Sequence, residues 1–108
     1  MRDDSLYLRH ILDAIEAICQ YTGTTAREEF IQNPILRDAV IRQLEIIGEA
    51  SNRLSDETRL ASPDTQWAQI ISMRNRLIHG YFQVDVDLVW EIITNDLPAL
   101  KQQIESIV

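Results

Sequence analysis

The chain has 108 residues, which fits one domain and leaves little room for a second. With 45% apolar and 25% charged residues, its composition is that of an ordinary globular protein and excludes a disordered chain. Seventeen acidic against ten basic residues give a formal charge of −7, which should repel a phosphate backbone at long range. The single cysteine, Cys19, excludes an internal disulfide and a cysteine-based zinc site.

No stretch of the sequence has the length of apolar residues that a membrane span needs. The first ten residues are acidic and lack the apolar core of a signal peptide. We therefore expect a cytoplasmic protein without a membrane partner.

Apolar residues at helical spacing predict a first helix from about Asp4 to Tyr21, with Gly23 as its stop. The segment Thr25–Glu28 has the pattern of a capping box, which predicts a short helix through Ile31.

Asn33 followed by Pro34 is typical of a helix start and opens a second long helix, to about Leu54. Gly48 in its middle costs about 1 kcal/mol relative to alanine, so we expect another helix to approach closely there. Gly48 lies with Ile41 and Asn52 along a second face of this helix, apart from its main apolar stripe. A small bundle has too few helices to bury this extra face, which favours a dimer. Residues 55–61 are predicted as one helical turn or a loop.

Ser62 and Pro63 predict the cap and first residue of a third long helix that continues to about His79 and ends at Gly80. Residues 81–84 follow as a connector. Asp85 then caps a last helix that keeps its apolar phase through Pro98, so we expect a kink or two collinear helices there. The expected fold is all-α, an antiparallel bundle of four main helices plus one or two short ones, in a single domain over residues 1–108.

A twenty-residue stretch between Asp64 and Asp85 has no carboxylate, and it holds Arg74, Arg76 and His79. On a helical wheel with Trp67 at 0°, Arg74 falls at about 340°, inside the apolar stripe, and Arg76 at about 180°, on the solvent side. A buried guanidinium needs a partner or an opening. Either Arg74 pairs with Glu45 or Glu49 of the second helix, or the stripe opens into a cleft where Arg74 meets an anion.

His79 near a helix end would ordinarily be a capping residue that interacts with the helix dipole. Asn75 and His79 are four residues apart, so in a continuous helix they share a face. Arg74 and His79 would not converge in one straight helix. They could converge if the helix breaks, or if a second chain supplies one of them.

Residues 74–81 read Arg-Asn-Arg-Leu-Ile-His-Gly-Tyr, which resembles the R-x4-H-x-Y motif of the HEPN superfamily. The chain is similar over nearly its full length to HepT-type toxins, the partners of minimal nucleotidyltransferase antitoxins called MntA. The similarity includes residues 44–50, the segment 80–85, Trp67, Trp90 and residues 96–98.

The resemblance implies an all-α homodimer that is a metal-independent endoribonuclease, the toxin of a type VII-like toxin–antitoxin system. It implies Arg74 and His79 as catalytic residues at a dimer cleft, with Asn75 in support and Arg76 as a peripheral RNA contact. A histidine can exchange protons with a ribose 2′-hydroxyl or a leaving 5′-oxygen, and an arginine can hold the scissile phosphate. The RNA target, tRNA or mRNA, is left open. No cofactor or metal is expected.

The resemblance also implies that an MntA-type nucleotidyltransferase attaches AMP to Tyr81 and silences the toxin. Taken alone, Tyr81 could be a turn aromatic that packs beside Phe82. Two other functions stay open at this point: a non-catalytic HEPN module that binds a nucleotidyltransferase, and a dimeric scaffold in which Arg74 is locked to a glutamate.

Overall fold

The computed structural model describes residues 3–79 and 83–108, with the side chains of all of these except Arg74, Ile78 and His79. Its elements, in chain order, are α1 (Ser5–Thr22), α2 (Arg27–Ile31), α3 (Pro34–Asn52), α4 (Asp56–Leu60), α5 (Trp67–Ile71), α6 (Met73–Leu77), β1 (Ile78–His79), β2 (Gln83–Val84), α7 (Val86–Glu91), the π-helical turn η1 (Ile92–Asp96) and α8 (Leu97–Ile107).

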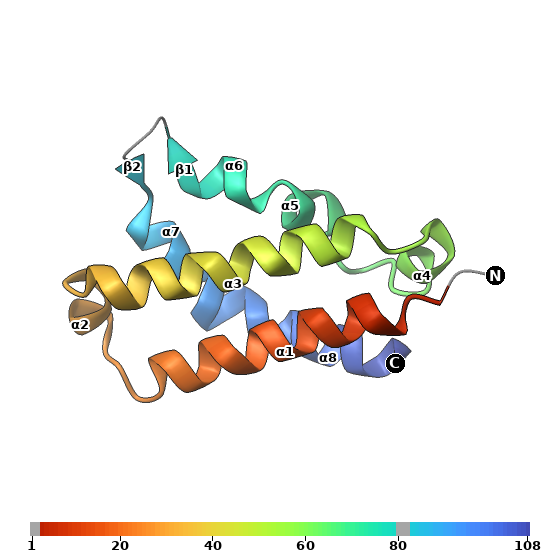
Figure 1. Cartoon of the computed structure of the whole chain (residues 1–108), viewed down its shortest axis with the longest axis horizontal. Helices are drawn as coiled ribbons and strands as arrows, with labels where there is room; N and C mark the ends of the chain where they lie inside the picture. Colours follow the sequence, from red (N-terminus) through yellow and green to blue (C-terminus); the bar gives the residue numbers. More distant parts are fainter. Residues whose placement is uncertain (1–2, 80–82) are drawn as a thin grey trace.

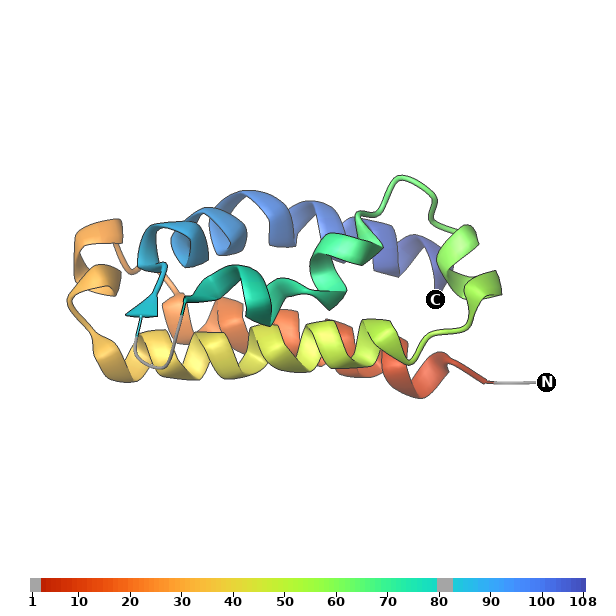
Figure 2. The ribbon, with the colours of Figure 1, turned by 90° about the horizontal axis from the view of Figure 1, so that it is seen from above.

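Four helical segments alternate in direction: α1, α3, α5 with α6, and the continuous α7–η1–α8 (Figure 1). In that view α3 lies between α1 and the α5–α6 segment and contacts both. Seen from above, α5 and α6 also run beside η1 and α8 (Figure 2). The mostly helical structure confirms the expected all-α class.

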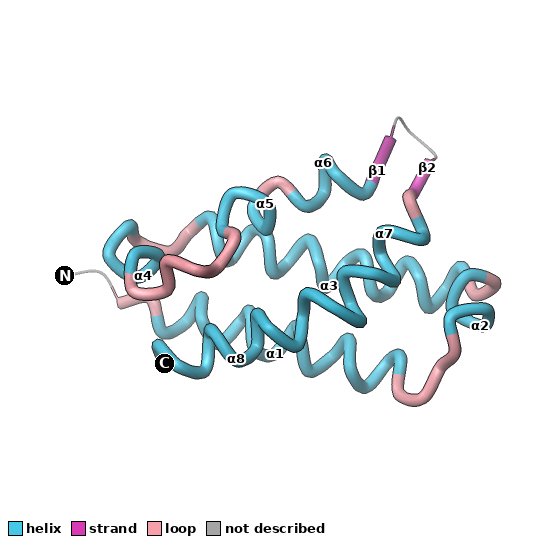
Figure 3. Tube along the Cα trace, turned by 180° about the vertical axis from the view of Figure 1, so that it is seen from behind, coloured by secondary structure: helices cyan, strands magenta, loops and turns pink. Residues whose placement is uncertain are grey.

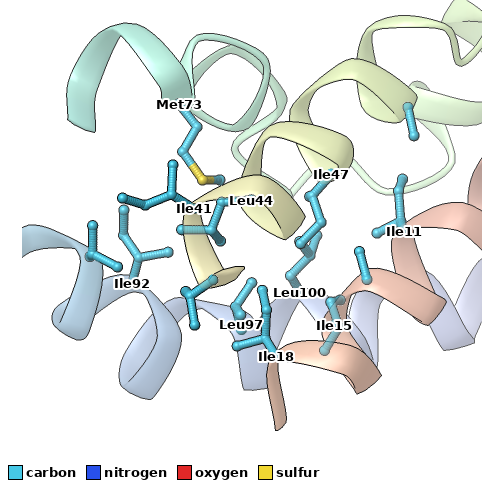
Figure 4. Close-up of a cluster of buried hydrophobic side chains, with 14 of the residues drawn as sticks. Ile11, Ile15, Ile18, Ile41, Leu44, Ile47, Met73, Ile92, Leu97 and Leu100 are labelled. Atoms are coloured by element: carbon cyan, nitrogen blue, oxygen red, sulfur yellow. The ribbon is translucent and has the colours of Figure 1, made fainter. Parts of the chain in front are cut away.

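The core lies where these segments face one another. Figure 4 shows isoleucines of α1 meeting residues of α3 and α8, with Met73 of α6 closing the cluster from the far side of α3. Ile11, Leu44 and Ile47 are fully shielded from solvent. Burying one such side chain stabilises the fold by about 1.5–3 kcal/mol, so the core fixes where α6 sits against α3.

Three helix ends follow the sequence. Asn33 Oδ1 accepts the Leu36 amide at 3.1 Å, and Asp85 Oδ1 accepts the Leu88 amide at 3.1 Å. Gly23 ends α1 with a φ of 47°, a conformation that disfavours other residues. The predicted capping box is one residue out, because α2 is capped at Ala26 and its amide donates to Glu29 rather than to Glu28.

The close approach expected at Gly48 is confirmed. A Cβ atom at this position would lie 2.9 Å from the carbonyl oxygen of Ile70 in α5. Of the two residues that share this face of α3 with Gly48, Ile41 is only 7% exposed, while Asn52 is exposed. Gly48 and Ile41 are thus covered within the chain, so this face does not by itself require a second chain, and the dimer stays a prediction.

The predicted third helix from Ser62 to His79 is wrong in its bounds. The hydroxyls of Ser62 and Thr65 lie 2.6 Å apart in a turn, and α5 begins only at Trp67. The helix is interrupted at Ser72, whose hydroxyl donates to the Ala68 carbonyl at 2.9 Å. Because a serine side chain competes with the backbone ladder in this way, a break in the helix there is understandable.

Beyond α6 the chain forms a short antiparallel hairpin instead of more helix (Figure 3). Ile78 pairs with Val84 and His79 with Gln83, and the Asp85 amide donates to the Leu77 carbonyl at 2.8 Å. The expected connector over 81–84 is therefore partly strand, although residues 81 and 82 lie outside the described residues. The open question over residues 55–61 is settled as a helical turn, α4, capped by Ser55.

The last segment is helical without a break from Val86 to Ile107 and so runs through Pro98. It contains the π turn η1, in which the Leu97 amide donates to the carbonyl of Ile92, five residues earlier. Ile92 and Leu97 are both buried, whereas Ile93, which regular helical spacing from Val89 to Leu97 would bury, is half-buried. The π turn inserts one residue and thereby shifts the apolar phase.

Candidate functional site

The motif residues lie at the end of the third helical segment. Arg74 and Asn75 belong to α6, and Asn75 is exposed. His79 lies in β1, two residues after α6 ends at Leu77, and its backbone pairs with Gln83. Tyr81 lies outside the described residues. The structure therefore brings the backbones of Arg74 and His79 to one helix–hairpin junction.

One expectation about these residues is corrected. Asn75 and His79 do not share a helical face, because the helix has already ended between them. The wheel that placed Arg74 at the centre of the buried stripe assumed one straight helix, but the chain breaks at Ser72. Among the described side chains of α6, Met73 and Leu77 are buried.

A polar pocket of about 270 Å³ lies between α3 and α5, just before the motif. Glu45 and Glu49 line it together with Arg42 and Asn52, and Ile71 closes it from α5. These are the two glutamates that sequence reasoning offered as partners of Arg74. They lie beside the segment that leads into α6, so an ion pair between Arg74 and one of these glutamates stays a prediction.

A second pocket, of about 190 Å³, lies on the α8 side of α5 and α6. Arg76 lines it and is half-buried, so it does not stand in open solvent as the wheel suggested. The other wall comes from η1 and α8, which supply Asn95, Asp96 and Leu97. Sequence reasoning missed this pocket because its two walls lie about twenty residues apart and meet only in the folded chain.

The carboxylate-free stretch of the sequence becomes α5, α6 and the hairpin, on one side of the bundle (Figure 1). Its positive charge is bordered by acidic residues from other elements, namely Glu45 and Glu49 on α3 and Asp96 beside α8. Among the described residues, no cluster of three or more His, Cys, Asp or Glu side chains is arranged to hold a metal ion. Within the same part of the chain, no helix combines the length and apolarity that crossing a membrane requires.

A helical bundle with an R-x4-H-x-Y motif where its third segment ends is the architecture that the HEPN resemblance implies. Comparison with protein-family models matches residues 11–107 to the family described as "Ribonuclease HepT-like". The chain therefore belongs to the HepT-like ribonuclease family, and the expected enzyme class, a ribonuclease, is confirmed at this level.

Named relatives agree with this assignment. A protein of Methanocaldococcus jannaschii named "Putative RNase MJ1380" is 39% identical over 98% of this chain and 97% of its own length. The "Probable ribonuclease HepT" of Thermococcus cleftensis is 40% identical over 94% of this chain and 92% of its own length. A third relative, named "Gamma-glutamylcyclotransferase and putative RNase MJ0434", is 42% identical, and the chain spans 48% of its length. No solved structure gave a significant match.

Proposed function

We propose that this chain is a metal-independent endoribonuclease and the toxin of a toxin–antitoxin pair, with Arg74 and His79 as its catalytic residues. The observation that carries the proposal is their placement. Both lie at the junction of α6 and the β1–β2 hairpin, in the stretch without carboxylates, in a chain of a ribonuclease family.

The chemistry follows from the two side-chain types. A neutral imidazole of His79 takes the proton of a ribose 2′-hydroxyl, and the resulting oxygen attacks the adjacent phosphorus. Alternatively, a protonated His79 donates to the leaving 5′-oxygen. Arg74 holds the phosphate and stabilises the charge that develops on it. In either role the products carry a 5′-hydroxyl end, because the bond to the 5′-oxygen is the one that breaks.

Asn75 supports this site as a polar neighbour on α6, where it is exposed. A homodimer accounts for how Arg74 and His79 act on one phosphate, since the second chain completes a cleft around the junction. Residues 1–108 act as one HEPN domain, and the site of action that suits a toxin directed at cellular RNA, tRNA or mRNA, is the cytoplasm.

Alanine substitutions test the two catalytic assignments. Arg74→Ala and His79→Ala should each abolish RNA cleavage and growth arrest while the protein still folds, with a loss of roughly 10²–10⁴-fold for the proton-transfer residue. Lys101→Ala, a lost cation on the exposed surface of α8, serves as the control and should keep its activity. Equal losses in all three would point to general charge attraction instead. Full cleavage by both site variants would place the active site elsewhere, whereas no cleavage by the purified wild-type protein would favour the non-catalytic HEPN module.

Regulation is proposed at Tyr81. A nucleotidyltransferase of the MntA type adds one or more AMP units to its hydroxyl, two residues past His79 in the sequence. Each phosphodiester brings about one negative charge next to a stretch of only about +2, within the roughly 8 Å over which charges act at physiological salt. The modified site then repels RNA or is filled by the AMP itself.

Tyr81→Phe should remain toxic but resist silencing by the co-expressed transferase. Mass spectrometry of the co-expressed protein reads out the modification, with Tyr7 and Tyr21 as internal controls in the same chain. AMP-sized mass increments on Tyr7 or Tyr21 in place of Tyr81 would refute the assignment.

A further inference from the structure

The pocket beside Arg76 has no part in the catalytic proposal, yet it is built like a small binding site. Its floor is apolar and closed: Met73, Ile92, Leu97 and Leu100 are each at most 4% exposed. Its rim includes Arg76, Asp64 and Asp96, so one basic and two acidic residues line the pocket. An apolar floor with a few polar groups at the rim is the usual form of a ligand pocket.

The charged groups at this rim are not used by the fold. Within the described part of the chain, neither Arg76 nor Asp96 makes a hydrogen bond or ion pair through its side chain, although both line the same pocket. The guanidinium of Arg76 keeps contact with solvent, since it is not among the buried unpaired groups of the described residues, and a ligand with matching acceptors can replace the water there.

Size and charge restrict what can enter. An apolar cavity of about 150 Å³ holds a benzene ring, so about 190 Å³ accommodates a somewhat larger flat ring system. One arginine and two aspartates give the rim a charge of −1, from +1 and −2, which disfavours a phosphate group. The pocket therefore suits a neutral aromatic ring that offers both hydrogen-bond donors and acceptors.

We propose that this pocket binds an unpaired guanine base of the RNA substrate and sets the base preference of cleavage. Guanine offers the O6 and N7 acceptors that arginine pairs with, and amino and ring N–H donors that an aspartate accepts. Proteins read single-stranded RNA by taking splayed-out bases into such pockets. The proposal deepens the proposed function and rests on it.

The position of the pocket relative to the motif fits this role. Arg76 follows Arg74 by two residues on α6, which is about 3 Å along the helix axis and about 200° around it. An RNA strand that crosses α6 can thus leave a phosphate on the Arg74 side and place a neighbouring base on the α8 side. Asn95 on η1 supplies an amide at the same rim.

Mapping of the cut sites in a random-sequence RNA tests the proposal. The wild-type protein should show guanine enriched at one fixed position next to the cut. Asp96→Asn keeps the shape but removes the acceptor charge, so the enrichment should fall by roughly tenfold. Ala99→Leu adds bulk at the pocket wall and should remove the enrichment, whereas Ala68→Leu, on the exposed side of α5 and outside the pocket, should retain it.

A binding measurement separates this proposal from the catalytic one. Guanosine should shift the NMR methyl signals of Met73 and Leu100, while cytidine and ribose 5-phosphate should not. Methyl shifts with guanosine but no RNA cleavage would support guanine binding in this pocket and refute the proposed ribonuclease activity. Cleavage without guanine enrichment would overturn the pocket's role, even if guanosine binds, because the pocket would then take a free nucleoside.

Discussion

Asp4 connects the start of α1 to the cap of α4. Its Oδ2 atom accepts hydrogen bonds from the Ser55 amide at 2.9 Å, the Ser55 hydroxyl at 2.6 Å and the Thr58 hydroxyl at 2.6 Å. Asp4 is only 6% exposed, so solvent does not replace these bonds when the carboxylate is removed. The neighbouring Asp3 is different: it is fully exposed and accepts from Ser5, whose amide lowers the pKa of this carboxyl.

Asp4→Ala should lower the free energy of unfolding by roughly 1–3 kcal/mol, because it leaves the half-buried donors of Ser55 and Thr58 without this acceptor. Asp3→Ala is the matched control and should have a much smaller effect. Urea denaturation followed by circular dichroism measures both. Equal midpoints for the two variants would show that the Asp4 network is not holding the N-terminus.

Gly48 marks the point where α5 crosses α3. Gly48→Ala would gain about 1 kcal/mol in helix propensity, but its Cβ would meet a backbone carbonyl at 2.9 Å that cannot rotate away. We expect overpacking to win, with a net loss of about 1 kcal/mol or more in the free energy of unfolding. Gln102→Ala, on the exposed side of α8, controls for propensity alone. A stabilised Gly48→Ala protein would contradict the close approach.

The sequence predicted those features that a single residue determines, such as the end of a helix. Asn33, Asp85 and Gly23 have the side chain, or lack one, that a helix end requires, so their roles could be predicted. Ser72 could not, because a serine hydroxyl that bonds to the preceding turn is compatible with a continuous helix as well as with a break.

The π turn η1 sets the phase of the last helical segment. Apolar spacing alone predicts Ile93 in the core, but the five-residue step from Ile92 to Leu97 buries Ile92 at 2% exposure instead. The turn precedes Pro98, which cannot donate the amide bond of a regular helix. A π turn of this kind could not be predicted from the sequence, because the apolar residues keep helical spacing on both sides of it.

Ile92→Ala and Ile93→Ala distinguish the two phases. If the π turn is correct, Ile92→Ala should cost about 2–5 kcal/mol, as large-to-small changes in a core do, and Ile93→Ala clearly less. Thermal or chemical unfolding compares them directly. A larger loss for Ile93→Ala would mean that the helix is regular through this segment.

The hairpin after α6 shows the limit of pattern-based reasoning for an element. Each strand has two residues, too short for an alternating pattern to be seen. The sequence therefore predicted a connector after the third helix, but it extended that helix to His79, two residues beyond its end at Leu77, and did not predict that His79 would lie in a paired strand. The pocket beside Arg76 was equally hidden, since it depends on how α6 packs beside α8.

At the scale of the whole molecule, one chain forms a bundle of 45 × 30 × 21 Å with its own core. The face of α3 that carries Ile41 and Gly48 packs against the chain's own helices. The prediction of a dimer therefore depends on the HEPN resemblance and on the need to complete a cleft at the motif. Light scattering at micromolar concentration should return twice the chain mass of 12.5 kDa. A 12.5 kDa particle that still cleaves RNA would show that one chain suffices for the site.

The central claim is that this chain cuts RNA with Arg74 and His79 and without a metal ion. The most direct test incubates purified chain, free of any nucleotidyltransferase, with RNA in the presence of EDTA and analyses the new ends. The account predicts unimpaired cleavage that leaves 5′-hydroxyl ends and is lost in His79→Ala. Intact RNA, cleavage abolished by EDTA, or cleavage that persists in His79→Ala would contradict it.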